Sequence, residues 1–454
     1  MSQPLEYAAN DSISNAHAEN PELLPSLAKD RTLSMWDIIV LCAGMVVNVV
    51  GLVIPGQVLL RGAYSPLEIL IACFWGFSLV TVLIVLTGDI GTKYGLPFTV
   101  IIRDCFGKKG ALVGSLCRAV VCMTWTGVLL FFGTEAINTV LQTMTGISAF
   151  WVVFAIFAAL QLINASRNVK SMSRFGWVAI PILAVALVFL VAWLLQEYAV
   201  SLPTVLAASP LPGEGFPFIT VVAIFSGGWL SEALNGSDLS RKIRLPEHPE
   251  RMPFLKRNAR LMAGFAIGFI GTGVMLSLAG LVCAYLTNSA DPVGVVKAAF
   301  ASKPAALIFS CVVIVMAQWS TNTAANIFPA TLIFLNAFPR LSFARATWLV
   351  GLVSCCMMPW LLASYLDYVQ MVFSALLAPL LGIMLVHYYV IRKGELDVDS
   401  LYDADMPDWK APGLLSLVAG LIAGAVFHDW AFFAAFPVAA ICHLLLMRRT
   451  QQAR

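Results

Sequence analysis

Residues 225–238 read FSGGWLSEALNGSD, which places three glycines, a glutamate and an asparagine inside an otherwise apolar segment. In hydrocarbon every backbone N–H and C=O needs a partner within the protein. Irregular backbone at membrane depth is tolerated only where it lines a cavity or is buried in protein. We therefore expect the helix through these residues to be broken.

A second segment of this kind lies at 48–56, NVVGLVIPG, which mixes Asn, Gly and Pro. Close helix packing against glycine is the alternative explanation for either segment alone. Their positions favour breaks, because they fall in the first helices of two consecutive five-helix units. Units with an odd number of spans insert in opposite orientations, as in secondary transporters whose broken helices bracket a midplane substrate site.

The composition is that of a polytopic membrane protein. Of the 454 residues, 59% are hydrophobic and 12% are charged, against roughly 25% charged residues in soluble proteins. A bilayer-crossing helix needs about 20 predominantly apolar residues, and twelve segments qualify. They run over 36–60, 67–87, 111–142, 149–165, 177–196, 216–237, 260–286, 304–337, 345–364, 367–391, 413–427 and 429–447.

The basic residues predict the orientation of these spans. With a cytosolic N-terminus, the cytosolic segments hold 25 of the 28 Lys and Arg residues and leave Arg61, Lys297 and Lys303 outside. This bias follows the positive-inside rule, and the polar first 34 residues show no signal peptide. We expect an inner-membrane protein with both termini in the cytosol.

The expected organisation follows from these spans. It is a cytosolic tail at 1–34, a first five-helix repeat at 35–200, a second, inverted repeat at 201–393, a cytosolic loop at 394–412, two further helices at 413–447 and a cytosolic tail at 448–454.

The cysteines and histidines indicate no metal centre. The ten cysteines show no Cys-x-x-Cys spacing and lie mostly in apolar runs, where buried thiols are common, and the five histidines are scattered. We expect no cofactor, no transition metal, no disulfide and no nucleic-acid partner. The lipid bilayer and a small molecule are the expected partners, and a monomer is expected to suffice.

Span eight carries an unusual polar stretch, QWSTNTAANIFP, at 318–329. Hydroxyls in membrane helices often bond back to their own helix, which is the alternative here. One helix face nevertheless collects Ala317, Ser320, Thr321 and Ala324, with Asn326 slightly around from them. Ser and Thr oxygens beside the freed carbonyls of a broken helix suit a small hard cation. An Asn carboxamide offers a donor and an acceptor to a planar amide-like ligand.

Motifs over most of the chain resemble those of the nucleobase-cation-symport family, which includes hydantoin, allantoin, uracil and cytosine permeases. They are GMVVN at 44–48, GDIGTKYGLPFTVIIRDCFGKKGA at 88–111, Trp125 with Gly127, Trp229 with Asp238, STNTAAN at 320–326 and APLLGIMLVHYYVIRKGELDVDSLY at 378–402. The resemblance implies an all-α, leucine-transporter-like fold with twelve helices. Two inverted repeats with discontinuous helices 1 and 6 would work by alternating access, beside two C-terminal helices.

The resemblance also implies two binding sites. The cation site, with Na+ as a candidate ion, would use the carbonyls of Gly44 and Val47 together with Ala317, Ser320 and Thr321. The substrate site would use Asn48, Trp125, Gly228, Trp229 and Asn326. Two indoles can sandwich a flat heterocycle by offset stacking, although plain packing between helices is the alternative for both.

Two positions of the substrate site depart from the family pattern. Leu129 stands four residues after Trp125, where hydantoin and allantoin permeases carry a glutamine, so the polar edge of a ligand must be read elsewhere. Glu232 and Glu135 are acids inside spans, which makes them functional candidates. Glu232 would accept from a ligand amino group, carry a coupling proton or cap the unwound segment.

We therefore expect a symporter, driven by Na+ or H+, that imports a nucleobase or related planar heterocycle of the cytosine, purine, allantoin or hydantoin class. Alternatives are a symporter for a thiamine-precursor aminopyrimidine and an uncoupled facilitator or channel. A channel would need a continuous polar lining, whereas here the polar groups concentrate at mid-span. A membrane-embedded enzyme would need Asp-rich or His-rich clusters at one interface, which the sequence lacks.

Overall fold

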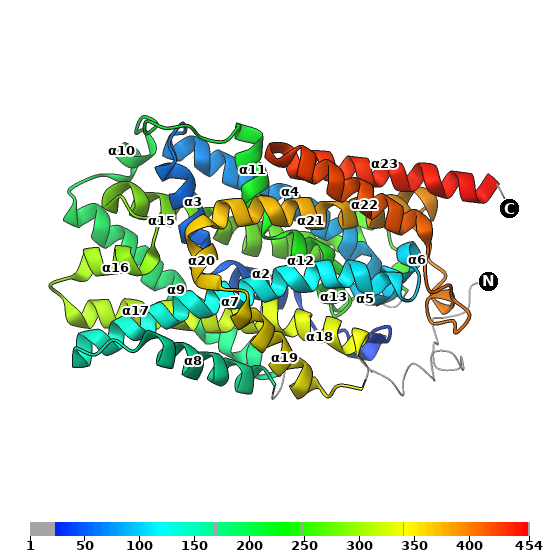
Figure 1. Cartoon of the computed structure of the whole chain (residues 1–454), viewed down its shortest axis with the longest axis horizontal. Coiled ribbons are helices and arrows are strands. Elements are labelled where there is room, and N and C mark those ends of the chain that lie inside the picture. The colour runs from blue at the N-terminus through cyan, green and yellow to red at the C-terminus, as the bar shows by residue number, and fades with distance from the viewer. Residues whose placement is uncertain (1–22, 167–169, 247, 339, 453–454) are drawn as a thin grey trace.

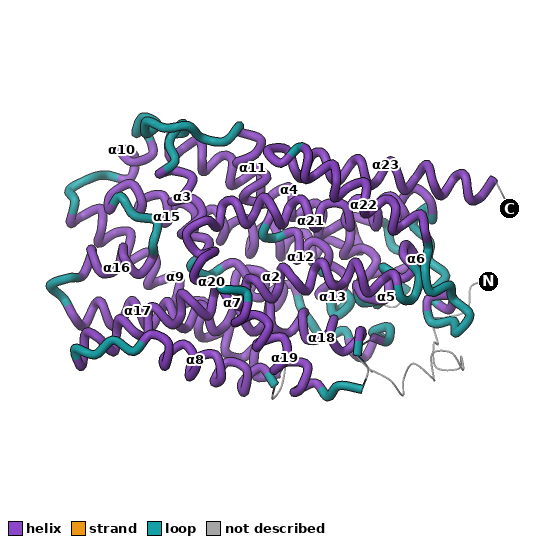
Figure 2. Tube along the Cα trace, viewed as in Figure 1, coloured by secondary structure: helices purple, strands orange, loops and turns teal. Residues whose placement is uncertain are grey.

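The computed structural model describes residues 23–166, 170–246, 248–338 and 340–452. These residues form helices and connecting loops, with a single isolated bridge between Leu33 and Ile243 and no strand (Figure 2). Most helices run along one direction, with α5, α6 and the last residues of α23 at one end of the bundle and α10 and α16 at the other (Figure 1). The expected all-α class is confirmed.

The first half of the chain begins with a short 3-10 turn, η3 (Ala28–Asp30). Its long helices are α2 (Met35–Val46), α3 (Val50–Leu60), α4 (Pro66–Tyr94), α7 (Gly110–Thr145), α8 (Phe150–Ala165) and α9 (Lys170–Glu197). Short helices between them are α5 (Phe98–Ile101), α6 (Arg103–Phe106) and α10 (Leu202–Leu206).

The second half opens with a helix in three pieces, α11 (Phe218–Gly227), α12 (Leu230–Leu234) and α13 (Gly236–Ser240). Next come η4 (Pro249–Arg251), α14 (Phe254–Gly264), the π turn η5 (Phe265–Gly271), α15 (Thr272–Thr287), α16 (Pro292–Phe300), α17 (Pro304–Thr321), the π turn η6 (Asn322–Ile327) and α18 (Phe328–Ala337). The remainder is α19 (Phe343–Cys356), α20 (Pro359–Leu362), η7 (Ala363–Tyr365), α21 (Leu366–Leu385), the π turn η8 (Val386–Ile391), η9 (Asp399–Leu401), α22 (Ala411–Val426), η10 (His428–Trp430) and α23 (Ala431–Gln452).

Helices lie in all twelve expected spans. Within the described residues, five helices are long and apolar enough to cross a membrane, or six when the bent pair α2 and α3 counts as one span. Shorter apolar helices occupy the remaining segments. Large apolar side chains such as Trp75, Val185 and Leu352 are exposed, as expected for a surface in contact with lipid. The count of twelve crossings and the inverted repeat stay predictions.

The break in the first span lies earlier than its proline suggests. Helices α2 and α3 meet at an angle of 50° around residues 47–49, whereas Pro55 lies inside α3. Pro55 lies in the second turn of α3, where it removes the backbone hydrogen bond to the Gly51 carbonyl without ending the helix. The expected break in the sixth span lies at Gly228 and Trp229.

Spans seven, eight and ten contain π turns, and span nine is shorter than expected. Span eight, expected to be one continuous helix over 304–337, contains the π turn η6 at its polar stretch. Span nine, expected over 345–364, ends at Cys356. There Met358 takes a positive φ of 50°, and Pro359 starts the next short helix because it has no N–H to extend the previous one.

Candidate functional site

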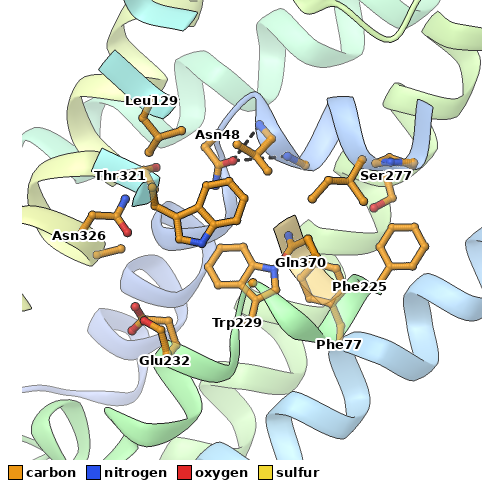
Figure 3. A pocket seen from close by; sticks show the side chains of 18 residues that line it. Asn48, Phe77, Leu129, Phe225, Trp229, Glu232, Ser277, Thr321, Asn326 and Gln370 are labelled. Carbon is orange, nitrogen blue, oxygen red and sulfur yellow. Dashed lines mark hydrogen bonds between the residues drawn. The ribbon is translucent and has the colours of Figure 1, made fainter. Parts of the chain in front are cut away.

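A cavity lies where the breaks of the first and sixth spans meet α7, α17 with η6, and α21. It encloses about 630 Å³ of empty space, counting the part open to solvent. Its wall includes all seven residues expected to bind substrate: Asn48, Trp125, Leu129, Gly228, Trp229, Glu232 and Asn326. Figure 3 shows Leu129, Thr321 and Asn326 on one side and Phe77, Phe225 and Gln370 on the other.

Phenylalanine side chains pack against both indoles. The Trp125 ring meets Phe373 edge-on, with centroids 5.5 Å apart. The Trp229 ring meets Phe269 edge-on at 5.0 Å and lies tilted against Phe77 at 6.1 Å. These edge contacts hold the indoles in place, and both rings line the cavity.

Asn48 closes the break in the first span. Its Oδ1 accepts hydrogen bonds from the backbone N–H groups of Val50 at 2.9 Å and Gly51 at 3.4 Å. Its Nδ2 donates to the carbonyls of Val46 at 3.1 Å and Met45 at 3.4 Å. Helix ends leave such groups without partners. Both ends of the carboxamide therefore serve the backbone, a role that the sequence did not reveal.

Asn326 reaches the cavity from the π turn η6. Its Nδ2 donates to Oδ1 of Asn322 at 3.3 Å. Asn322 in turn donates to Oε1 of Gln161 at 2.8 Å and to the Thr126 carbonyl at 3.2 Å. The Asn326–Asn322 bond uses Nδ2 of Asn326 and not its Oδ1. The nearby Thr323 hydroxyl bonds back to the Trp319 carbonyl, at 2.8 Å.

Four of the residues expected to bind a cation come together at the end of α2. The Thr321 hydroxyl donates to the carbonyls of Gly44 at 3.2 Å and Val47 at 3.1 Å. Ala317 is buried in the same small cluster as Val47. The side chain of Ser320 lies outside the part of the chain that the structure describes. Carbonyls freed by a broken helix are the groups with which such transporters hold Na+.

Glu232 lies in the first turn of α12 and is 5% exposed. Arg118 on α7, only 1% exposed, donates from Nε to the Ser231 carbonyl at 3.2 Å and lies 3.9 Å from the Asp238 carboxylate. Arg118 also interacts electrostatically with Glu232. From its sequence position Arg118 was expected among the cytosolic basic residues, but it is a buried partner of the acids in the broken helix. Glu135 lies outside the cavity wall.

Two histidines that the sequence analysis treated as scattered lie in contact. Nδ1 of His387 in η8 lies 2.9 Å from Nε2 of His443 in α23. Nε2 of His387 lies 3.1 Å from the Asp104 carboxylate, and one ligand atom from each of these histidines and Cys105 falls within 4.8 Å of the others. The pair is 56 residues apart in the chain, so spacing alone could not reveal it.

Asp104 on α6 is the centre of this cluster. It accepts two hydrogen bonds from Arg392, at 2.8 Å and 2.6 Å, and one from Nζ of Lys410 at 3.3 Å. Burial raises the pKa of Asp104, but the hydrogen bonds from His387 and Arg392 outweigh it and hold that pKa well below the usual range. The carboxylate stays ionised and ties α6 to the end of η8 and the start of α22.

A cavity at the crossing of two broken helices, inside an all-helical membrane protein, defines a secondary-transporter fold. A model of the family of permeases for cytosine/purines, uracil, thiamine and allantoin matches residues 25–445. The chain belongs to this family. Its members are permeases, so the expectation of a transporter rather than an enzyme is confirmed, and the protein is a multi-pass membrane protein.

Relatives of known name match most of the chain. A hydantoin permease of Microbacterium maritypicum is 25% identical, covering 94% of this chain and 88% of its own. An allantoin permease of Bacillus subtilis is also 25% identical, over 94% and 93%. A purine-uracil permease of Arabidopsis thaliana is 26% identical, over 98% and 80%.

Solved structures share the fold. Mhp1, a nucleobase-cation-symport-1 family transporter in a closed conformation with bromovinylhydantoin bound, superposes with a TM-score of 0.88 at 23% identity, covering 96% of both chains. A Na+-coupled sialic acid symporter in an outward-open state superposes with a TM-score of 0.63 at 10% identity, over 96% of this chain and 95% of its own. These likenesses confirm the expected leucine-transporter-like architecture.

Proposed function

We propose that this permease imports a nucleobase or a related planar heterocycle of the cytosine, purine, allantoin or hydantoin class by cation symport. The observation that carries this proposal is the cavity wall, which combines two edge-braced indoles with the Asn326 carboxamide. An indole offers a flat heterocycle a stacking surface worth about 0.5 to 1.5 kcal/mol beyond burial. A carboxamide supplies the polar recognition of its edge.

Coupling to a cation is supported by the position of Thr321. Its hydroxyl bonds to the carbonyls of Gly44 and Val47, and Asn326 follows five residues later on the same polar stretch. A set made only of oxygens suits a hard cation, so Na+ is the favoured ion and H+ the alternative. A cation there would hold α2 against α17 and so order the broken segment that borders the substrate cavity.

Melting of the purified protein tests this proposal, since a ligand that binds the folded state raises the melting temperature by mass action. Uracil, cytosine, allantoin and hydantoin are screened in Na+ and again in K+. We expect at least one to stabilise the protein, and more in Na+, because coupling between two ligands is reciprocal. Absence of stabilisation by all four in both cations would contradict the proposal.

A matched pair of variants tests the cation site. Thr321→Ala removes the hydroxyl that bonds across to α2, and we expect it to abolish the Na+ dependence of ligand binding. Thr323→Ala removes a hydroxyl that bonds within its own helix and should keep that dependence. Equal Na+ dependence in the two variants would rule out Thr321 as a cation ligand.

A second candidate substrate is a thiamine-precursor aminopyrimidine, favoured by the carboxylate of Glu232 on the cavity wall. A carboxylate accepts hydrogen bonds from an exocyclic amino group. Under this alternative, Glu232→Gln should weaken binding of cytosine and aminopyrimidines about tenfold and leave uracil unaffected. Equal loss for uracil and cytosine would instead indicate that Glu232 supports the broken helix.

The proposal also covers the membrane, the orientation and the transport mechanism of the permease. The permease works in the inner membrane with both termini in the cytosol, as a monomer, by alternating access of two inverted repeats over 35–200 and 201–393. The arrangement of basic residues supports the orientation. An uncoupled facilitator is the competing proposal, and it predicts uptake that does not respond to an imposed cation gradient.

A further inference from the structure

Gln370 is a polar residue of the cavity wall to which sequence analysis gave no role. It lies in the second turn of α21, is 3% exposed and lines the cavity. Among the described residues, its Oε1 has no hydrogen-bond partner. Buried side-chain polar atoms are nearly always paired. Exchanging the two amide atoms would leave an unpaired N–H in the same place, so the observation holds for either orientation.

The break in the sixth span is shaped to admit this side chain. A Cβ at Gly228 would stand 2.3 Å from Oε1 and 2.4 Å from Nε2 of Gln370. A Cβ at Gly227 would stand 2.3 Å from the backbone carbonyl of Gln370. Two consecutive glycines therefore bring α21 against the broken helix and place the Gln370 carboxamide at its edge.

The start of α21 is fixed from its other side as well. Gln57 on α3 accepts a hydrogen bond from the backbone N–H of Asp367 at 3.3 Å and donates to the Ala363 carbonyl at 3.3 Å. Arg61, directly after α3, forms an ion pair with Asp367. Gln370 follows Asp367 by one helical turn, so its backbone position is set by contacts with both broken helices.

Gln370 supplies a polar group that is lacking at Leu129, the position where related permeases carry a glutamine. Leu129 on α7 has no polar group that could bind the polar edge of a ligand, whereas Gln370 brings a carboxamide with an unpaired Oε1 to the same cavity. Figure 3 places Gln370 across the cavity from Leu129 and Asn326. We infer that Gln370 binds the lactam edge of the substrate and sets the selectivity for it. The inference rests on the proposed heterocycle transport and names the polar group that discriminates among heterocycles.

The chemistry of a carboxamide defines the substrate edge. Gln370 presents one acceptor and one N–H donor side by side. A lactam carries an N–H beside a C=O, so the two groups form two parallel hydrogen bonds. A ligand methylated at that nitrogen loses one bond and buries the glutamine oxygen unpaired, which sites built for hydrogen bonding reject strongly. Asn326 on the opposite wall is free to read a second polar edge.

The test compares hydantoin, uracil and allantoin with their N-methyl derivatives by equilibrium binding to the purified wild type and to three variants. We expect the wild type to bind at least one parent ring at least tenfold more tightly than one of its N-methyl isomers, a difference of about 1.4 kcal/mol. Gln370→Leu should weaken the parent ring at least tenfold and bring the ratio close to one. Gln370→Glu, which keeps the shape but loses the donor, should also weaken the lactam. Gln142→Leu, at an exposed site on α7, is the matched control and should behave as wild type.

A double variant distinguishes loss of ligand binding from loss of folding. Gln370→Leu combined with Leu129→Gln moves the carboxamide to the opposite wall and should recover part of the affinity. Unchanged discrimination against N-methyl rings in Gln370→Leu would overturn the inference while leaving heterocycle transport standing. A wild type that binds none of the rings would instead refute the proposed function.

Discussion

Asn48 serves both as a cap for α3 and as part of the cavity wall, and two substitutions separate these roles. Asn48→Ala leaves the Val50 N–H without its acceptor and should cost about 1 kcal/mol of stability, seen as a lower melting temperature. Asn48→Ser keeps a capping oxygen without a carboxamide. We expect Asn48→Ser to retain ligand affinity within about threefold, and binding as weak as in Asn48→Ala would show direct ligand recognition.

Site residues could be predicted from the sequence where their spacing places them on one face of a single helix. Thr321 and Asn326 lie on one polar stretch, and both reach the cavity wall. Gln370 and Arg118 escaped prediction because their partners lie on other spans. A lone Gln in an apolar span is the signal that could have identified Gln370, since polar groups in hydrocarbon need a reason.

Gly227 and Gly228, at the break of the sixth span, allow α21 to pack closely against the broken helix. Gly227→Ala directs a methyl group at a backbone carbonyl of α21, which cannot move aside, so overpacking should cost about 1–3 kcal/mol. Gly228→Ala meets only the flexible end of Gln370. We expect Gly228→Ala to melt close to wild type yet bind ligand at least tenfold more weakly.

Melting and binding measured on both glycine variants check this contrast. The reverse pattern, with Gly228→Ala unstable and Gly227→Ala impaired only in binding, would contradict the packing described for α21.

The sequence predicted that the first and sixth spans are broken from two features together: Gly, Pro and polar residues at mid-span, and their place as the first helices of two consecutive five-helix units. Within the segment 48–56 it did not say which residue marks the bend: Pro55 lies inside α3, while Asn48 caps the bend itself. The π turn at 322–327 was also missed. A π turn depends on how a helix packs against its neighbours, and no residue type marks it in a single sequence.

For the whole molecule, Asp104 is a junction that ties the loop after α4 to η8 and to the start of the C-terminal helix pair. Asp104→Asn would leave Arg392, Lys410 and His387 without their shared carboxylate. Removing one partner of a buried ion pair typically costs about 3–5 kcal/mol. We expect a large drop in melting temperature at neutral pH and little change in the affinity of the correctly folded fraction.

The pH dependence follows from the direction of the pKa shift. Because the folded protein lowers the pKa of Asp104, its contribution is present above the unfolded value near 4 and is lost as pH falls through the lower folded value. The melting-temperature gap between wild type and Asp104→Asn should stay constant from pH 8 to 5 and narrow below about pH 4. A gap that widens on acidification would contradict this assignment.

The membrane class and the helical fold could be predicted from apolar spans and from the placement of Lys and Arg, because both are imposed by the bilayer. The His387 and His443 contact could not, since it joins helices that are distant in the chain.

Uptake into proteoliposomes tests the central claim most directly. Purified protein is reconstituted, and uptake of labelled uracil, cytosine, allantoin and hydantoin is measured with an inward Na+ gradient, with an inward H+ gradient and with neither. The account predicts that at least one heterocycle accumulates above its outside concentration when a cation gradient is imposed and only equilibrates without one. Uptake that never exceeds equilibration, or that is the same with and without both gradients, would contradict cation-coupled import.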